Sequence, residues 1–89
     1  MARASKPNGP WVPPSYDDDD IRAIRALAAG VASEGQQRRA LEWIITKACG
    51  YYDLSFRPGV EGARDTDFAE GKRFVGAQIV KLTKATPQA

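Results

Sequence analysis

Apolar residues recur at helical spacing in three segments of this chain. In the first segment, Ile21, Ile24, Leu27 and Ala28 share one face of a predicted helix, and Gly30 follows where a left-handed residue ends many helices. The predicted helix is short and rich in alanine, so we expect it to need a partner surface in order to stay folded.

Four aspartates, Asp17 to Asp20, stand directly before this segment. Such a run could bind a divalent cation. An aspartate N-cap followed by acids in the first turn explains it better, because the helix dipole favours negative charge there. Arg22 also follows at the spacing of a helical ion pair. We therefore interpret the run as a helix start.

The second segment, from Gln37 to Cys49, has the most regular period. It follows Ser33-Glu34-Gly35-Gln36, which has the S-x-x-Q form of a capping box, and Gly50 comes after it at a position typical of a C-cap. Trp43 flanks the apolar face, either as a rim residue of the core or as a contact for a partner. That face consists of Ala40, Leu41, Ile44, Ile45 and Ala48.

The third segment follows a connection from Tyr51 to Arg64, which is long for a compact helical domain and is therefore a candidate contact surface. A helix is predicted to begin around Asp65-Thr66-Asp67 and to stop before Thr86-Pro87. Its apolar stripe consists of Phe68, Val75, Ile79 and Leu82.

Two glycines, Gly71 and Gly76, interrupt this last helix. Glycine costs up to ~1 kcal/mol in a helix interior, so either these glycines let another helix approach closely or they are incidental. Because Gly71 lies one turn before Val75 on the apolar side, we expect close packing there.

The N-terminal segment, residues 1–16, contains four prolines and is predicted to be an extended arm. Trp11, Val12 and Tyr16 are apolar anchors along it. The arm is either a disordered leader or a segment that lies along a neighbouring subunit and inserts Trp11 into a pocket. We favour the second, because large aromatic residues are typical of interfaces.

Together these segments predict an all-α fold. It is a small three-helix assembly with an extended Pro-rich N-terminal arm (1–16), a helical domain (17–85) with a long structured loop before the last helix, and a short tail (86–89).

Composition narrows the chemistry open to such a fold. The 89 residues include no histidine and a single cysteine, Cys49, so the usual histidine base, the Ser-His and Cys-His pairs and a zinc site cannot be assembled. Carboxylate pairs such as Asp65 with Asp67, or Asp67 with Glu70, are explained by helix initiation. We expect no enzymatic activity, no cofactor and no metal site.

The same composition also bears on the compartment in which the protein is made and on whether it crosses a membrane. A lone thiol suits synthesis in a cytoplasm, and the apolar runs are far shorter than the ~20 residues of a membrane span. The net charge of +2 is too small to indicate nucleic-acid binding by itself. Candidate phosphate contacts are Arg38, Arg39, Lys72, Arg73, Lys81 and Lys84.

Two blocks of sequence carry a resemblance to a known family. The block 41–50 is an apolar helix that ends in Cys-Gly, and an aromatic follows at Ser55-Phe56. The block 68–76, FAEGKRFVG, is similar to the pattern F-x-E-G-R-R-x-V-G, with Lys72 in place of the more usual arginine. Over residues 35–82, a little over half of the chain, the sequence resembles small proteins from the head and portal gene cluster of short-tailed, double-stranded DNA phages, the Bordetella-podophage type.

This resemblance implies an all-helical, non-enzymatic component of a phage virion, and it brings no catalytic residues with it. It implies close helix packing at Gly71 and Gly76, core positions for Phe56 and Phe68, and a polar link between Glu70 and Arg73. The arm before Asp17 lies outside the shared pattern.

We therefore expect a small multi-copy structural protein of the portal–tail region or the head interior, located in the host cytoplasm before assembly. Its partners would be portal, adaptor or tail subunits in a symmetric assembly. The alternative is a nucleic-acid-binding or transient assembly factor in DNA packaging. The candidate partner-binding residues are Trp11, Val12, Tyr16, Trp43, Tyr51, Tyr52, Phe56 and Phe74.

Overall fold

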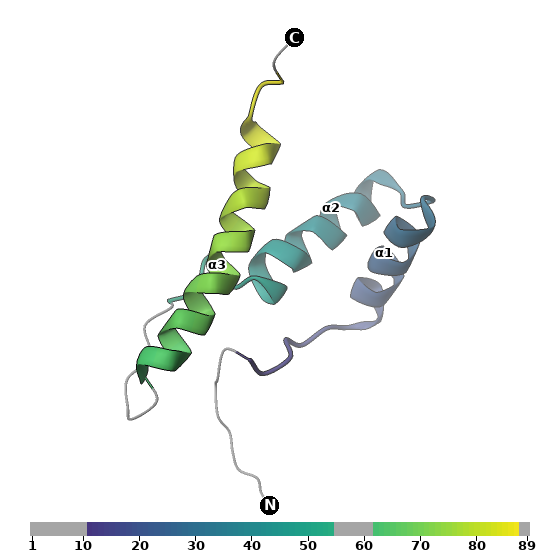
Figure 1. Cartoon of the computed structure of the whole chain (residues 1–89). Helices are drawn as coiled ribbons and strands as arrows, with labels where there is room; N and C mark the ends of the chain where they lie inside the picture. Colours follow the sequence, from purple (N-terminus) through teal and green to yellow (C-terminus); the bar gives the residue numbers. More distant parts are fainter. Residues whose placement is uncertain (1–10, 55–61, 88–89) are drawn as a thin grey trace, which may run out of the picture.

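The computed structural model describes residues 11–54 and 62–87, and 71% of these are helical. The elements are α1 (Asp18–Ala29), α2 (Glu34–Trp43), a short π-helix η1 (Ile44–Ala48) that continues α2, and α3 (Gly62–Lys84). No strand occurs in the described ranges, and the all-α prediction is confirmed. α1 and α2 lie side by side, and α3 crosses the chain at η1, beyond the end of α2 (Figure 1).

The aspartate run starts α1, as predicted. The Asp17 carboxylate accepts a hydrogen bond from the Asp20 backbone N–H at 2.9 Å, and the Asp20 carboxylate accepts one from the Asp17 N–H at 3.0 Å. Asp19 pairs with Arg22 at 2.8 Å. At the other end, Gly30 takes a left-handed φ of 76° and ends the helix, also as predicted.

Arg39 of α2 joins the two helices of this hairpin. Its Nε donates to Asp20 Oδ1 at 2.9 Å, and a terminal nitrogen lies 3.0 Å from Asp17 Oδ2. The pKa of Asp17 is lowered below its ordinary 3.8, first by the hydrogen bond from the Asp20 N–H and then by the charge of Arg39. The N-cap of α1 is thus also an ion-pair partner of α2.

The capping box predicted at the start of α2 is present. Ser33 Oγ accepts from the Gln36 N–H at 3.1 Å, and Gln36 Oε1 accepts from the Ser33 N–H at 2.9 Å. The helix ends at Gly50, whose φ of 59° is left-handed, as the sequence predicts.

Between these caps the helix widens into η1, which the sequence pattern does not indicate. The Cys49 N–H bonds to the carbonyl of Ile44, five residues back, at 2.9 Å. The Thr46 hydroxyl donates to the Glu42 carbonyl at 2.7 Å. Ile45 and Cys49 are buried on this widened turn and meet α3.

α3 begins at Gly62, earlier than the start predicted around Asp65. Asp65 therefore lies inside the first turn, where its charge still suits the dipole. The last helical residue is Lys84, before Thr86-Pro87 as expected. The loop predicted from Tyr51 to Arg64 is described only as far as Leu54, and residues 55–61, with Phe56, lie outside the described ranges.

α3 packs through small residues. Gly62, Ala69 and Gly76, spaced seven apart, are its buried positions, and we call them the seam. A Cβ on Gly76 would lie 3.0 Å from Cβ of Cys49 and 3.1 Å from Cβ of Tyr51. The close approach predicted for Gly76 is therefore present. The one predicted for Gly71 is wrong within this chain, because nothing lies within 4 Å of a Cβ built there.

The predicted apolar stripes do not form the core. Phe68, Val75 and Leu82 are 48%, 51% and 71% exposed, so the core position implied for Phe68 is wrong. The first stripe is also largely outside, with Ile21 and Leu27 exposed. The buried apolar residues are Ala23, Ala40, Ile45, Cys49 and Ala69. Helices approach most closely where side chains are small, and that proximity leaves no space for the large ones.

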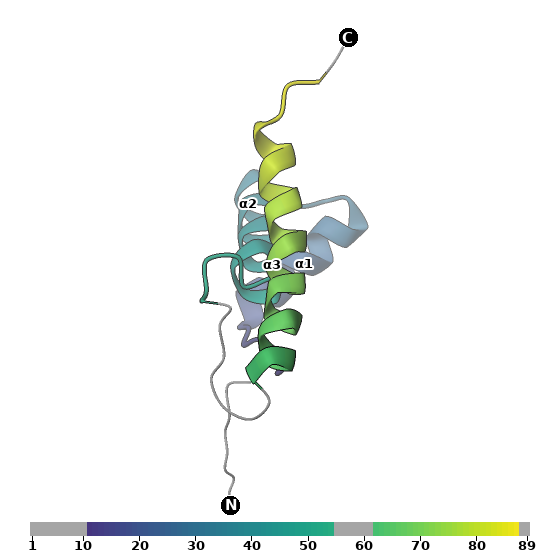
Figure 2. The same ribbon diagram turned by 60° about the vertical axis from the view of Figure 1, so that its left-hand side comes forward.

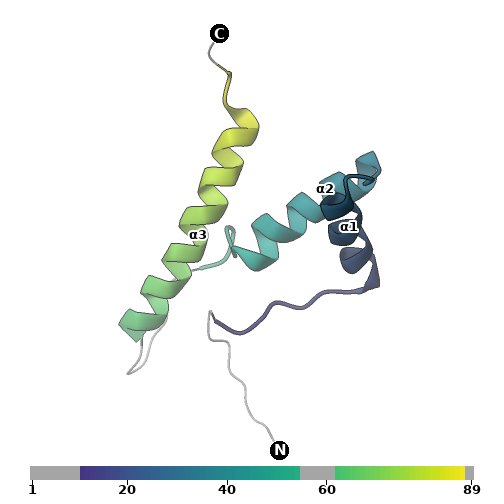
Figure 3. The same cartoon turned by 45° about the vertical axis from the view of Figure 1, so that its right-hand side comes forward.

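The resulting molecule is thin, with principal dimensions of 47 × 36 × 16 Å. Seen edge on, α3 lies in front of the α1–α2 hairpin (Figure 2). A third view shows α1 and α3 well apart, and no contact joins them (Figure 3). Among the described helices, none is long and apolar enough to cross a membrane.

Gly76→Ala should destabilise the fold by about 1–3 kcal/mol, because the new methyl group meets two Cβ atoms that cannot rotate away. Gly35→Ala is the matched control: it places the same methyl group on α2 with nothing within 4 Å, so it should be neutral or stabilising by up to ~1 kcal/mol. Urea unfolding followed by circular dichroism measures both. Equal effects of the two substitutions on stability would contradict the close packing of α3 at Gly76.

Arg39→Gln should lower stability near neutral pH, and the loss should shrink in acid. The pKa of Asp17 is lower in the folded protein than the 3.8 expected in the unfolded chain. The stability that the ionised carboxylate contributes is therefore fully present above the unfolded pKa, and it is lost as the pH falls through the folded pKa. Urea midpoints between pH 7 and pH 2 measure this. Arg38→Gln, which breaks the exposed 3.5 Å pair with Glu34, is the control. If the stability difference between wild type and Arg39→Gln did not change with pH, the stabilising ion pair between Arg39 and Asp17 would be contradicted.

Candidate partner-docking surface

Most of the large apolar side chains in the described ranges are exposed. No large side chain is fully buried within the described ranges. Exposed large apolar residues are Trp11, Val12, Tyr16, Ile21, Leu27, Val31, Leu41, Tyr52, Leu54, Phe68, Phe74, Val75 and Leu82. Isolated exposed apolar residues are ordinary in a monomer, whereas exposed apolar residues that lie together mark an interaction surface.

The described part of the arm, residues 11–16, lies along the protein's own helices. The indole N–H of Trp43 donates to the Ser15 carbonyl at 3.1 Å. The ring of Trp11 meets that of Phe68 edge to face, with centroids 6.4 Å apart. Trp11 nevertheless stays 56% exposed, so its ring retains surface for a further contact.

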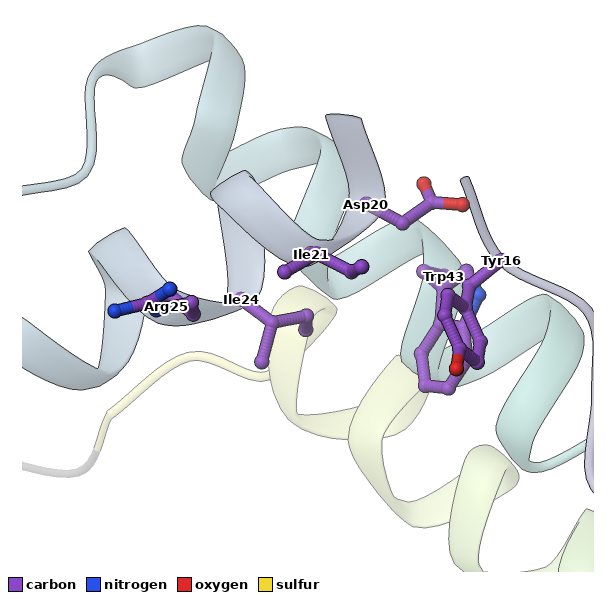
Figure 4. A pocket seen from close by; sticks show the side chains of 6 residues that line it. All are labelled: Tyr16, Asp20, Ile21, Ile24, Arg25 and Trp43. Carbon is purple, nitrogen blue, oxygen red and sulfur yellow. The ribbon is translucent and has the colours of Figure 1, made fainter. Parts of the chain in front are cut away.

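The arm closes one side of a hollow, which we call the arm groove. Tyr16 and Trp43 lie together at one end, and Ile21 and Ile24 lie along its α1 side (Figure 4). Its volume is about 290 Å³. Its lining is Tyr16, Asp20, Ile21, Ile24, Arg25 and Trp43. Because this lining is mainly apolar, the groove suits an apolar side chain better than a polar ligand.

A second hollow, of about 380 Å³, lies between α2–η1 and the end of α3. Tyr52 borders it, together with the basic residues Arg38 and Lys84. Its lining is Arg38, Leu41, Glu42, Ile45, Thr46, Tyr52, Val80, Thr83 and Lys84. The partner-binding residues predicted from sequence are therefore divided between different hollows.

Tyr51, which follows η1, contacts Arg73 of α3 and is therefore engaged within the chain. The Nε of Arg73 donates to the Tyr51 carbonyl at 3.0 Å, and its guanidinium lies 5.7 Å from the centre of the Tyr51 ring. Arg73 also pairs with Glu70 at 3.1 Å, which is the polar link implied by the resemblance. The Tyr51 ring meets Tyr52 edge to face at 4.8 Å.

The structure brings some of the predicted partner-binding residues together. Tyr16 and Trp43 share the arm groove, whereas Phe74 lies exposed on α3, beside a hollow that it shares with Tyr51. Val12 is exposed on the arm. Phe56 falls outside the described residues.

Three of the six predicted phosphate contacts are engaged in ion pairs with carboxylates. Arg38 pairs with Glu34, Arg39 with two aspartates, and Arg73 with Glu70. Lys72 is half-buried, while Lys81 and Lys84 are exposed near the end of α3. In the described ranges no group of three histidine, cysteine or acidic side chains could hold a metal ion.

Sequence reasoning missed several surface residues because it assigned them to the protein's own core. Ile21 and Ile24 line the arm groove, and Val75 and Leu82 are exposed on α3. The signal that could have revealed this is the seven-residue spacing of small residues in α3, which competes with the stripe of large ones as the packing face.

Comparisons of the sequence with protein-family models and with known proteins, and of the fold with solved structures, find no match.

Deleting residues 1–16 should leave the helical fold intact, because the cap of α1 begins at Asp17. The emission of Trp43 should shift to the red, since the arm no longer covers its ring. Trp11→Ala in the full chain is the control, because it also leaves Trp43 as the sole tryptophan but keeps the arm. Loss of the helical circular dichroism signal on deletion would show that the arm belongs to the core.

Proposed function

We propose that this chain is a small structural subunit of a short-tailed phage virion. It would be present in many copies, at the portal–tail region or inside the head, and docked on larger portal, adaptor or tail subunits. The subunit has no enzymatic role and no cofactor in this proposal, and it stays in the host cytoplasm until assembly. The phage assignment is supported by the resemblance of blocks 41–50 and 68–76.

One observation carries the docking role: the chain buries small residues and exposes large ones. Its buried apolar positions are three alanines, one cysteine and one isoleucine, whereas five of its aromatic side chains in the described ranges are exposed. Exposed aromatic residues contribute most when a partner removes them from water. A surface of this kind supports a role in assembly.

The arm groove offers little polar chemistry to a substrate. The apolar arm groove offers two charged residues, Asp20 and Arg25, at its edge, and Asp20 is already paired with Arg39. The block 68–76 that carries the resemblance contributes Ala69 and Gly76 to the seam, and it also exposes Phe74 and Val75. The same short block thus supports both the fold and the outer surface.

Nucleic-acid binding is supported less well. Three of the six candidate phosphate contacts are arginines already paired with carboxylates. Forming a phosphate contact would require each arginine to exchange its carboxylate for a phosphate, which reduces the net gain. The other three candidates are lysines, of which Lys72 is half-buried and Lys81 and Lys84 are exposed near the end of α3. Contacts from two exposed lysines give only weak, salt-sensitive binding.

Quantitative mass spectrometry of purified virions tests the proposal. We expect this protein in the mature particle, at a ratio of several copies per portal ring, with the major head subunit as an internal standard. An abundant non-structural protein from the same lysate is the control for contamination. Absence from the particle would contradict the structural role and would indicate a factor lost during assembly.

Gel-shift titration of the purified chain with duplex DNA tests the alternative function, in which the protein binds nucleic acid. We expect no salt-sensitive shift at micromolar protein, and Lys81→Glu with Lys84→Glu should change nothing. A shift that both substitutions abolish would instead favour a packaging factor.

A further inference from the structure

α3 carries an apolar face that is largely exposed in the described chain, with the ring of Trp11 meeting it at Phe68. We call it the outer stripe: Phe68, Gly71, Val75, Ile79 and Leu82. These residues recur at intervals of three, four and seven, so they fall in one row on the helix surface. The seam of small residues lies to one side of this row, and its Gly76 faces Cys49 and Tyr51, directly after η1. α1 does not reach α3.

The acids of α3 lie towards its start, together with Arg64, and the other basic residues of the helix follow them. Its acids, Asp65, Asp67 and Glu70, all lie in the first half of the helix. No acid follows Glu70, whereas Lys72, Arg73, Lys81 and Lys84 do. A helix of this kind is complementary to a copy of itself that runs in the opposite direction, because the acids near the start of each copy then face the lysines near the end of the other.

We propose that α3 pairs with α3 of a second copy, antiparallel and along the outer stripe. The two-fold axis passes beside Val75, which is equidistant in sequence from Phe68 and Leu82. Phe68 then lies opposite the second copy's Leu82, and Val75 lies opposite its own equivalent. The interface is isologous, so one row of residues supplies both sides.

This arrangement accounts for Gly71. A glycine inside a helix costs up to ~1 kcal/mol, and within the chain nothing lies near enough to Gly71 to require it. In the antiparallel register Gly71 lies opposite the second copy's Ile79. The missing side chain leaves room for the large one, in the way that Gly76 leaves room for Cys49 and Tyr51 on the seam.

The same register brings opposite charges together beside the stripe. Asp67 of one copy lies next to Lys81 of the other, and the symmetry repeats the pair. A parallel pairing would place acids beside acids and lysines beside lysines, which is unfavourable. The charge pattern therefore favours a second copy of this chain as the partner of α3, and it favours the antiparallel direction for the second helix.

The inference extends the proposed function by assigning one face of the subunit to self-association. The two statements fail separately. A monomeric chain would leave the virion assignment untouched, and a particle without the protein would leave the dimer intact.

Sedimentation equilibrium of the full chain tests the dimer. We expect a reversible monomer–dimer equilibrium, and Val75→Glu should weaken it by roughly 100-fold, because two carboxylates then meet on the two-fold axis. Val31→Glu is the matched control: Val31 is 73% exposed but lies after α1, away from α3. A monomeric wild type, or a dimer that Val75→Glu leaves unchanged, would overturn the proposal.

Disulfide formation tests the direction, in a Cys49→Ala background that keeps the Cβ facing Gly76. Phe68→Cys and Leu82→Cys chains are mixed and oxidised. Antiparallel pairing predicts mainly mixed disulfides between the two variants. Phe68→Cys or Leu82→Cys homodimers in excess would show a parallel pair and would overturn the antiparallel register. Lys81→Asp should weaken the dimer, and adding Asp67→Lys to it should restore association; no restoration would remove the charge argument.

Discussion

The close contact at Gly76 is the constraint on which the rest of the structure depends. α3 meets the helical hairpin at η1, and there the backbone of α3 comes so near that a single methyl group would lie 3.0 Å from Cys49 Cβ. Only a small residue fits such a contact, so it decides which side of α3 faces inward. Once Gly76 and Ala69 face η1, the row through Val75 must face outward. The exposed stripe is therefore a consequence of the seam.

The parts of the fold that sequence could predict are those that depend on neighbours in the chain. Asp17 and Ser33 start helices because a side-chain oxygen can accept from a backbone N–H three residues later, and Gly30 and Gly50 end them because glycine accepts a left-handed φ. These interactions need no tertiary information. The helix count and the all-α class follow from them together with the 3.6-residue period.

The parts that sequence could not predict depend on distant residues. Helical periodicity marks Phe68 and Val75 as one face, but it does not say whether that face meets the same chain or another one. The bridge from Arg39 to Asp17 spans 22 positions, beyond the reach of any local pairing rule. The π-turn at η1 likewise leaves no mark in the apolar pattern, although it turns Cys49 towards Gly76. The candidate surface was therefore predicted only in part, through Trp43 and the arm.

This separation of small inner and large outer residues links folding to association. A chain whose interior holds mostly alanine gains little stability from burial of its own side chains. A partner that binds only the folded form adds stability, and the gain grows with the logarithm of the partner's concentration relative to its dissociation constant. In the proposed assembly many copies share one particle, so the outer residues contribute to folding only where the partners are present. Substitutions at Gly76 and at Val75, which are consecutive residues on adjacent faces of α3, should thus act on different processes: the first on the fold of each chain, and the second on the contacts between chains.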